Sequence, residues 1–400
     1  MKRPASSAKR KKLLMPMAVD DHASWLTIEI DRSALVENIS VFRRLVDPGT
    51  RLMAVVKADA YGHGLLLASE AFLAGGADLL GVHSLAEVRR LREGGIQAPV
   101  LILGPVTAGE LGQAVELGAE ITVASLSAVR ASADYAAASA TTVNVHLKVE
   151  TGVNRQGVVE EELSAVLKIM ADQPKLVLAG LASHFADVED TTDHAFALRQ
   201  MDRFQGFAEA LTQAGHSNFL CHMSCSASIL LWDRTQRDIA RVGISAYGIW
   251  PSRETLVAVR ERCRQEVVLR SAMTWKVRVS QIREVPAGQA VGYGRVWQAP
   301  TDSRIAVLPV GYSDGWLRAF SGRAHVLIRG RRAPLVGRIC MNLCMVDVTH
   351  IPEAVAGDTA VLLGSQGQET ITPSHLAEQL GTIPYEIVTL PGSTWTRVLI

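Results

Sequence analysis

The sequence predicts an α/β protein: an N-terminal (β/α)8 TIM barrel followed by a mostly β C-terminal domain. From about Trp25 to Arg262, short β-branched apolar runs alternate eight times with longer segments of helical periodicity. From about Gln265 onward, short alternating segments punctuated by Gly and Pro take over, which indicates a mostly β domain. The length of 400 residues also exceeds what one hydrophobic core usually organises. We therefore expect a barrel over 25–264 and a second domain over 265–400.

The eight apolar runs are the expected strands of the barrel. They are apolar along their length rather than alternating, which indicates a parallel sheet buried on both faces. An open doubly wound sheet is the alternative that the same pattern allows. The runs span residues 52–57, 78–84, 100–104, 120–125, 143–150, 178–185, 219–224 and 238–244.

Helical segments separate these runs and are expected to cover the outside of the barrel. Several of them end on glycine, the residue that commonly follows the last turn of a helix. The clearest examples span residues 64–76, 85–95 and 194–215.

The second domain is expected to consist of short strands with one long helical segment at 373–380. Its strand candidates alternate apolar and polar residues, as strands with one buried face do. These candidates lie within residues 271–285, 304–312, 324–330, 343–351 and 359–364.

Charge and cysteine usage limit the classes of function and location. Residues 1–24 form a basic tail that we expect to be disordered, because the first twelve residues carry six basic and no acidic side chains. The remainder then has 35 basic and 40 acidic residues, which argues against a nucleic-acid-binding body. The apolar segment after the tail is short and broken by Pro16, unlike a signal peptide, and no apolar run reaches the roughly 18 residues of a membrane span. Five cysteines, an odd number, suit a reducing cytoplasm better than a disulfide framework.

Several common catalytic motifs are absent from the sequence. There is no Gly-x-x-x-x-Gly-Lys-Ser/Thr, no His-Glu-x-x-His and no Gly-x-Ser-x-Gly. The stretch "GYGRVW" begins like a dinucleotide fingerprint, but Trp297 occupies the position of its third glycine. Nucleotide-phosphate, zincin and α/β-hydrolase chemistry are therefore not supported.

The ends of the predicted barrel strands carry cations and histidines. In a TIM barrel the carboxyl ends of the strands meet at one mouth, so these side chains are expected to converge there. Such a group without clustered carboxylates suits an anionic ligand rather than a metal ion, and it disfavours sugar hydrolysis. The candidates are Lys57, Lys148, Arg155, His184, His222, Ser224, Ser226 and Arg241.

Lys57 ends a buried run in the stretch "AVVKADAYGHG", and a buried cation there needs a partner or a chemical role. Desolvation and neighbouring cations lower the pKa of a lysine, which frees its amine for Schiff-base chemistry. Pyridoxal 5'-phosphate is the cofactor that most often uses such a lysine, together with a phosphate cradle and a partner for its ring nitrogen. Tyr61, Ser226 and the backbone of "RVGIS" can form the cradle, and Arg241 can face the nitrogen.

From about Trp25 to its C-terminus, the chain resembles the alanine racemases, which are fold-type III pyridoxal-phosphate enzymes. "AVVKADAYGHG" resembles their cofactor-lysine segment, which implies that Lys57 bonds the cofactor and Tyr61 binds its phosphate. "VHLKVETGVNRQGV" resembles the segment whose lysine, here Lys148, is often carbamylated and orients an arginine, here Arg155.

Further segments extend the resemblance through both domains in the same order. "SHFADVED", "CHMSCSAS" and "ARVGISAYGI" resemble family segments of the barrel, whereas "VGYGRVW", "PVGYSDGWLR" and "VGRICMNLCMVDV" resemble those of the β domain. The latter imply a second base, a tyrosine at the mouth of the active site and a backbone amide that binds the substrate carboxylate. The residues so implied are His184, His222, Ser226, Arg241, Gly243, Ile244, Tyr293, Tyr312 and Met341.

The resemblance implies an isomerase that interconverts L- and D-alanine with two bases, and supplies D-alanine for peptidoglycan. Lys57 would act on the D-face, and Tyr293 of the neighbouring subunit on the L-face, so a homodimer is implied. His184, hydrogen-bonded to Arg241, would assist Tyr293, because a tyrosine with a pKa near 10 is a poor base at neutral pH.

Departures from the family pattern bear on substrate breadth. Asn342 follows Met341 where many members have aspartate, Cys225 stands where many have asparagine, and Ser393 falls where some have a phosphate-binding tyrosine. Serine or other small amino acids are therefore alternative substrates. A fold-type III amino-acid decarboxylase is the less favoured alternative reaction, and a pyridoxal-phosphate carrier would lack the β domain.

Overall fold

The barrel predicted from the alternating pattern is present. The computed structural model describes residues 25–262, 267–392 and 395–400, and the predicted disordered tail lies outside these ranges. Eight parallel strands follow one another in the order β8-β7-β6-β5-β4-β3-β2-β9, which excludes the doubly wound alternative. The backbone N–H of Asp238 donates to the carbonyl of Cys221 at 3.1 Å and brings the two ends of the sheet together. The strands are β2 (Arg51–Val55), β3 (Leu79–Val82), β4 (Val100–Ile102), β5 (Ala119–Val123), β6 (Val143–Lys148), β7 (Leu176–Ala182), β8 (Leu220–His222) and β9 (Ile239–Val242).

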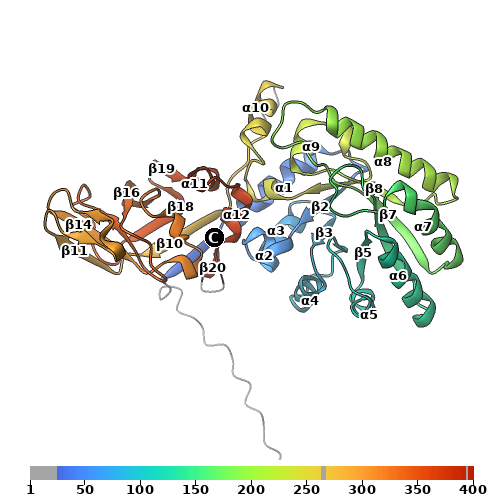
Figure 1. Cartoon of the computed structure of the whole chain (residues 1–400), viewed down its shortest axis with the longest axis horizontal. Helices are drawn as coiled ribbons and strands as arrows, with labels where there is room; N and C mark the ends of the chain where they lie inside the picture. Colours follow the sequence, from blue (N-terminus) through green and yellow to red (C-terminus); the bar gives the residue numbers. More distant parts are fainter. Residues whose placement is uncertain (1–24, 263–266, 393–394) are drawn as a thin grey trace, which may run out of the picture.

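Helices cover the outside of these strands (Figure 1). Their starts follow from local sequence: Ser84 and Glu87 form a capping box, and the side chains of Asp31 and Ser125 accept backbone N–H groups in two other first turns. The helices are α1 (Arg32–Leu45), α3 (Leu65–Ala74), α4 (Leu85–Glu93), α5 (Leu111–Glu116), α6 (Leu126–Ser139), α7 (Glu160–Asp172), α8 (Ala195–Gln213), α9 (Ser226–Leu231) and α10 (Arg253–Glu261). The segment α2 (Lys57–Tyr61) is a short left-handed turn after β2.

The second domain is built on a ten-stranded sheet whose main path runs β11-β14-β17-β16-β15-β18-β10-β1-β20, with β19 paired to β18. A separate pair, β12 and β13, carries the loop that contains Tyr293. The elements are β10 (Met273–Arg278), β11 (Gln281–Val285), β12 (Ala290–Val291), β13 (Trp297–Gln298), β14 (Ser303–Leu308), β15 (His325–Ile328), β16 (Arg331–Val336), β17 (Cys344–Asp347), β18 (Thr359–Gln366), β19 (Glu369–Ile371), α11 (Pro373–Leu380), α12 (Pro384–Thr389) and β20 (Thr396–Leu399).

The first strand of the chain corrects the predicted domain boundary. Strand β1 (Leu26–Ile30) lies in the sheet of the second domain, where it pairs antiparallel with β10 and parallel with β20. Its residues alternate between buried and half-buried positions, as suits a sheet with one covered face. The range 25–264 predicted for the barrel therefore begins with a strand that belongs to the other domain.

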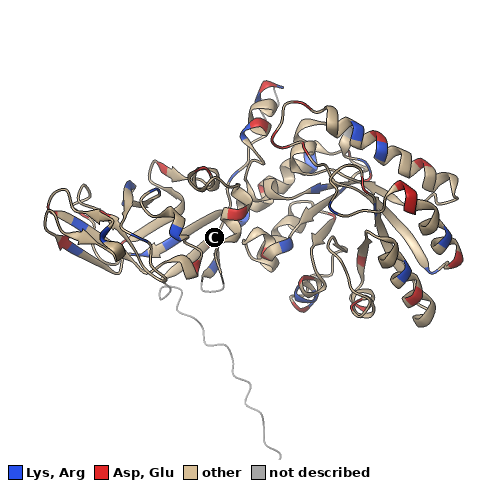
Figure 2. Cartoon of the chain, in the orientation of Figure 1, with Lys and Arg blue, Asp and Glu red and all other residues tan. Residues whose placement is uncertain are grey.

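The outer surface of the barrel carries both signs of charge. Figure 2 shows acidic and basic residues interspersed along α7 and α8. None of the helices in the described ranges is long and apolar enough to cross a membrane.

Helix α1 is tied to the segment that leads into the second domain by one buried side chain. Asn38 donates from its amide to the carbonyl of Arg270 at 2.8 Å and accepts the N–H of the same residue at 2.9 Å. Asn38 itself is fully buried, and both of these bonds satisfy backbone groups of Arg270.

Replacing Asn38 with alanine is expected to lower the free energy of unfolding by about 2 to 4 kcal/mol, since a donor and an acceptor of Arg270 lose their partner. Urea titration at one fixed protein concentration measures the loss. Arg44→Ala, on the exposed side of the same helix, is the control and is expected to stay within about 0.5 kcal/mol of the unaltered chain. Equal stability of the two variants would contradict this account of Asn38.

Candidate functional site

The carboxyl ends of the barrel strands gather the predicted cations and histidines. Lys57 follows β2, Lys148 ends β6, and His222 ends β8. Arg241 lies within β9, and His184 follows β7 by two residues. Parallel strands of one barrel direct these ends to one mouth, so the predicted convergence is confirmed for these five residues.

A left-handed turn follows Lys57 and sets the direction of Tyr61. Residues 58–61 have φ values between 51° and 56°, a conformation that costs roughly 1–2 kcal/mol per residue for side chains other than glycine. Glu87 offsets part of this cost by accepting the N–H of Ala58 at 2.8 Å. Asp59 holds the far side of the turn, because its carboxylate accepts the N–H of Leu65 at 3.1 Å.

The turn places the Tyr61 ring beside the start of the segment after β9. A Cβ at Gly243 would lie 2.8 Å from the Tyr61 hydroxyl oxygen, so only glycine leaves room there. The hydroxyl of Ser226 accepts the N–H groups of Gly243 at 3.0 Å and Ser245 at 3.4 Å. Ile244, also predicted to bind, is buried within the same segment. The backbone of Gly243 thus lies close to both the Tyr61 and the Ser226 hydroxyls, and groups of this kind are suited to holding a phosphate.

Arg241 is a buried cation whose partners are neutral. Its guanidinium donates to Nδ1 of His222 at 2.5 Å, to the carbonyl of His222 at 3.1 Å and to the carbonyl of Ser183 at 2.7 Å. A longer contact of 3.4 Å reaches Nδ1 of His184. Burial lowers the pKa of Arg241 to about 10, so it keeps its charge at neutral pH.

Burial and neighbouring cations lower the pKa values of the lysine and the histidine at the mouth. Desolvation, followed by the charges of Arg155 and Arg241, lowers the pKa of Lys57, although the residue as a whole is solvent-exposed. Burial and then Arg241 lower the pKa of His184 well below its ordinary value. A neutral imidazole and a lysine that loses its proton more readily than usual are the groups needed for proton transfer.

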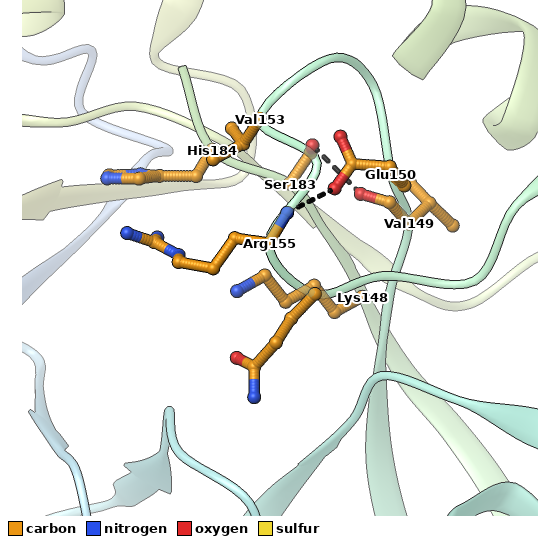
Figure 3. A pocket seen from close by; sticks show the side chains of 8 residues that line it. Lys148, Val149, Glu150, Val153, Arg155, Ser183 and His184 are labelled. Atoms are coloured by element: carbon orange, nitrogen blue, oxygen red, sulfur yellow. Dashed lines mark hydrogen bonds between the residues drawn. The ribbon is translucent and has the colours of Figure 1, made fainter. Parts of the chain in front are cut away.

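A pocket opens between β6 and β7 beside this group (Figure 3). Lys148, Arg155 and His184 line it together with Ser183, and the side chain of Arg155 extends between His184 and Lys148. Glu150 fixes the loop by accepting the N–H groups of Gly152 at 2.6 Å and Arg155 at 3.3 Å. Desolvation and then Arg155 lower the pKa of Lys148 to about 8. The pocket therefore combines two cations and suits a carboxylate or a similar anion.

The second domain brings together the other predicted residues. The N–H groups of Tyr312 and Ser313 donate to the carbonyls of Cys340 and Met341 at 3.1 and 3.0 Å. The amide of Asn342 donates to the hydroxyl of Ser313 at 2.7 Å. Tyr312 and Met341 thus lie on adjoining loops, with exposed fractions of 41% and 57%.

Tyr293 stands apart from these loops in sequence and is 72% exposed, more than Tyr312 or Met341. It lies between Gly292 and Gly294, which have φ values of 76° and 73°. A Cβ at Gly294 would come within 2.8 Å of the Arg338 guanidinium, so the backbone approaches that side chain closely. The Tyr293 ring is therefore presented to the surroundings by a tightly folded loop.

Some contributors to the site were not predicted. The roles of Glu87 and of the Ser183 carbonyl depend on tertiary contacts, and a backbone carbonyl leaves no sequence signal. Tyr385 was also missed; its hydroxyl donates to the Glu189 carboxylate at 2.9 Å, and its ring centroid lies 6.2 Å from that of Tyr61.

Within the described ranges, no three His, Cys, Asp or Glu side chains are grouped so as to hold a metal ion.

Family models match both domains. The alanine racemase N-terminal domain matches residues 30–251, and the alanine racemase C-terminal domain matches residues 272–399. The chain is 39% identical over 380 residues to an alanine racemase of Desulfosudis oleivorans, covering 93% of this chain and 95% of the relative. It is 36% identical over 378 residues to an alanine racemase of Methanococcus maripaludis, covering 94% and 98%.

Solved structures agree with the sequence relatives. Alanine racemase from Bacillus anthracis, crystallised with bound L-Ala-P, superposes with a TM-score of 0.87 at 31% identity and covers 94% of this chain and 95% of its own. The enzyme from a D-cycloserine-producing Streptomyces lavendulae gives a TM-score of 0.87 at 31% identity, with coverage of 94% and 97%. The chain therefore belongs to the alanine racemase family and is an isomerase.

Proposed function

We propose that this chain is a pyridoxal 5'-phosphate-dependent racemase of alanine, in which Lys57 and Tyr293 of the partner subunit exchange the α-proton. The observation that carries the proposal is the mouth of the barrel, where Lys57 has a lowered pKa beside the permanent charge of Arg241. A lysine of this kind, a phosphate cradle and a cationic partner for a ring nitrogen are the protein groups that this cofactor needs.

The residues present fit the cofactor. Gly243 keeps clear the space in front of the Tyr61 hydroxyl that a larger residue would fill. Tyr61, Ser226 and the backbone of Gly243 and Ile244 would hold the phosphate, and Lys57 would bond the aldehyde carbon. When bound, the cofactor supplies an electron sink that acidifies the α-proton of an amino acid.

Arg241 determines how strongly that sink acts. A guanidinium donates hydrogen bonds and does not accept a proton, so a ring nitrogen facing Arg241 stays unprotonated. An unprotonated ring withdraws electrons less strongly, which favours rapid return of the proton to the same carbon. Racemisation is therefore favoured over transamination.

His184 explains how a tyrosine can act as the second base. Because Nδ1 of His184 faces a guanidinium N–H, it is an acceptor, and the neutral ring carries its proton on Nε2. An Nε2–H that donates to the Tyr293 oxygen would stabilise the phenolate form of that tyrosine. Lys57 would serve the D-face and Tyr293 the L-face, so a proton leaves one side and another arrives on the opposite side.

The substrate carboxylate would be held by Arg155 and by the backbone amide of Met341, with Tyr312 at the mouth and Asn342 in the adjoining loop. Asn342 is neutral, and its amide donates to the hydroxyl of Ser313. The residue therefore adds no negative charge to the substrate site. A loop that adds no negative charge here also suits serine, which differs from alanine by one hydroxyl group. Serine is therefore the second substrate to be assayed.

A homodimer and a cytoplasmic role in peptidoglycan synthesis complete the proposal. The exposed Tyr293, Tyr312 and Met341 lie on the second domain, which suits residues that enter a partner's barrel. The four described cysteines are free thiols, as in a reducing compartment, and D-alanine is a component of peptidoglycan. No nucleic acid and no membrane partner are included, because the body of the chain has a slight excess of acidic residues.

The cofactor and reaction are tested together by spectroscopy and assay. We expect the purified protein to show an absorbance band at about 420 nm that borohydride abolishes, and Lys57→Ala to lack it. The protein should racemise L-alanine, with L-serine assayed in parallel. Absence of the band would overturn the cofactor assignment, whereas a band with decarboxylation and no racemisation would favour the decarboxylase.

Tyr293→Phe is expected to reduce racemisation by about 10² to 10⁴-fold, because the general base on the L-face is lost. Exchange of the α-proton of L-alanine with solvent should fall, while exchange from D-alanine by Lys57 continues. Tyr135→Phe, on α6, is the matched control and should leave both exchange rates unaltered. Equal effects of Tyr293→Phe on the two enantiomers would contradict the assignment of faces.

Mixing Tyr293→Phe with Lys57→Ala protein tests whether the two bases come from different subunits. In a mixed dimer, one site then combines the intact Lys57 of one chain with the intact Tyr293 of the other. Random mixing should restore about one quarter of the activity, since half of the dimers carry one such site of two. If both bases came from the same chain, mixing would restore none.

We further propose that Lys148 is carbamylated, because a pKa of about 8 leaves a useful fraction of neutral amine near neutral pH. The charge of Arg155 helps to lower that pKa, so Arg155→Met should raise it and reduce the carbamate fraction at pH 8. ¹³C NMR in labelled bicarbonate measures the carbamate, and Lys148→Gln identifies its resonance. A resonance that survives Lys148→Gln would refute the proposal.

A further inference from the structure

A line of hydrogen bonds crosses the interior of the barrel from Arg241 to the opposite end. The Arg241 guanidinium lies 2.5 Å from Nδ1 of His222, and Nε2 of His222 lies 2.7 Å from Nδ1 of His146. Nε2 of His146 lies 2.7 Å from the carboxylate of Glu120. Both histidines are fully buried, so these contacts satisfy all four of their ring nitrogens.

The barrel is shaped to admit the inner imidazole of this line. His146 faces Gly180 across β6 and β7, and the register of the two strands shifts between Val145 and His146. A Cβ at Gly180 would collide with Nδ1 of His146. The absent side chain and the irregular register therefore create the space in which His146 lies between its two partners.

The positions of the protons along the line follow from its two ends. Arg241 only donates, so Nδ1 of His222 must accept and its Nε2 must carry a proton. That proton is donated to Nδ1 of His146, which must therefore be unprotonated. The remaining proton of His146 is on Nε2 and is donated to the carboxylate of Glu120. Each imidazole is consequently neutral and held in one tautomer.

Glu120 occupies the end of the line that is farthest from the mouth. It lies at the amino end of β5, whereas His222 and Arg241 approach the carboxyl ends of β8 and β9. Its side chain is 32% exposed, so its charge remains partly hydrated while it accepts from a buried ring. The hydrogen bond from His146 lowers the pKa of Glu120, which keeps it an ionised acceptor at neutral pH.

We propose that Glu120 is a positioning residue for the racemisation: through His146 and His222, it fixes the guanidinium of Arg241 in the orientation that faces the cofactor nitrogen. This inference rests on the proposed function. Without an acceptor at Glu120, the Nε2–H of His146 is left unpaired in the barrel. Its other tautomer would place two N–H groups against each other and break the bond that orients His222 toward Arg241.

Two substitutions at Glu120 separate the acceptor from the charge. Glu120→Gln keeps an oxygen that can accept from His146, whereas Glu120→Ala removes it. Glu116→Ala, an exposed glutamate of the preceding helix α5, is the matched control. The whole chain carries 11 histidines, so ¹⁵N labelling of histidine alone gives a spectrum in which His146 and His222 can be assigned by substitution.

The first readout is the tautomer in the protein without cofactor. We expect both rings to show a protonated Nε2 and an unprotonated Nδ1 in the unaltered chain, in Glu120→Gln and in Glu116→Ala. In Glu120→Ala we expect at least one ring to show exchange between tautomers. Two rings that keep a single tautomer in Glu120→Ala would overturn the proposal, whatever the activity of the enzyme.

The second readout is the kinetics of the loaded enzyme. Glu120→Ala should lower kcat about tenfold with KM altered less than about twofold, and Glu120→Gln should restore most of kcat. An unaltered kcat in Glu120→Ala would also overturn the proposal. If the unaltered protein showed neither cofactor band nor racemisation, the proposed function would fail by itself, and the tautomer spectra would still report whether Glu120 orders the line.

Discussion

The burial of the Arg241 guanidinium without a carboxylate beside it is the constraint on which the site depends. Its hydrogen bonds go to carbonyl groups and to imidazole nitrogens, so its positive charge is solvated but not cancelled. That remaining charge contributes to the lowered pKa values of Lys57, Lys148 and His184. An adjacent carboxylate would have removed this influence, since an ion pair compensates much of the field of its members.

The lysine segment is held by both domains. Asp59, within the left-handed turn, accepts from Arg90 at 2.8 Å and lies 3.6 Å from Arg397 of β20. Arg397 also donates to the carbonyl of Gly62 at 2.9 Å. Because β20 pairs with β1, the two ends of the chain together position an arginine against the turn that presents Lys57 and Tyr61. The second domain therefore supports the turn after Lys57 of its own barrel through these bonds.

The sequence predicted the eight barrel strands because each is an apolar run bounded by polar or glycine residues, a signal that is local. Strand β1 was assigned to the wrong domain because its partners β10 and β20 lie about 250 and 370 residues away, and periodicity does not report such pairing. The line from His146 to Glu120 was missed for the same reason. The histidine in the run "VNVHLK" was the available signal, but its partners come from other strands of the barrel.

Inversion at a carbon requires a base on each face of that carbon. The mouth of the described barrel provides a candidate base for one face, Lys57. Lys57 is the lysine that follows β2, whereas Lys148 lies in the pocket with Arg155, whose charge contributes to the lowered pKa of Lys148. Tyr293 is on the other domain, and its 72% exposure leaves the ring free to contact another molecule. His184 is neutral and is oriented by Arg241. Its Nε2–H is the hydrogen-bond donor that a phenolate at the mouth would need. In the proposed mechanism the tyrosine of one subunit would meet the histidine of another, so that mechanism would require a dimer.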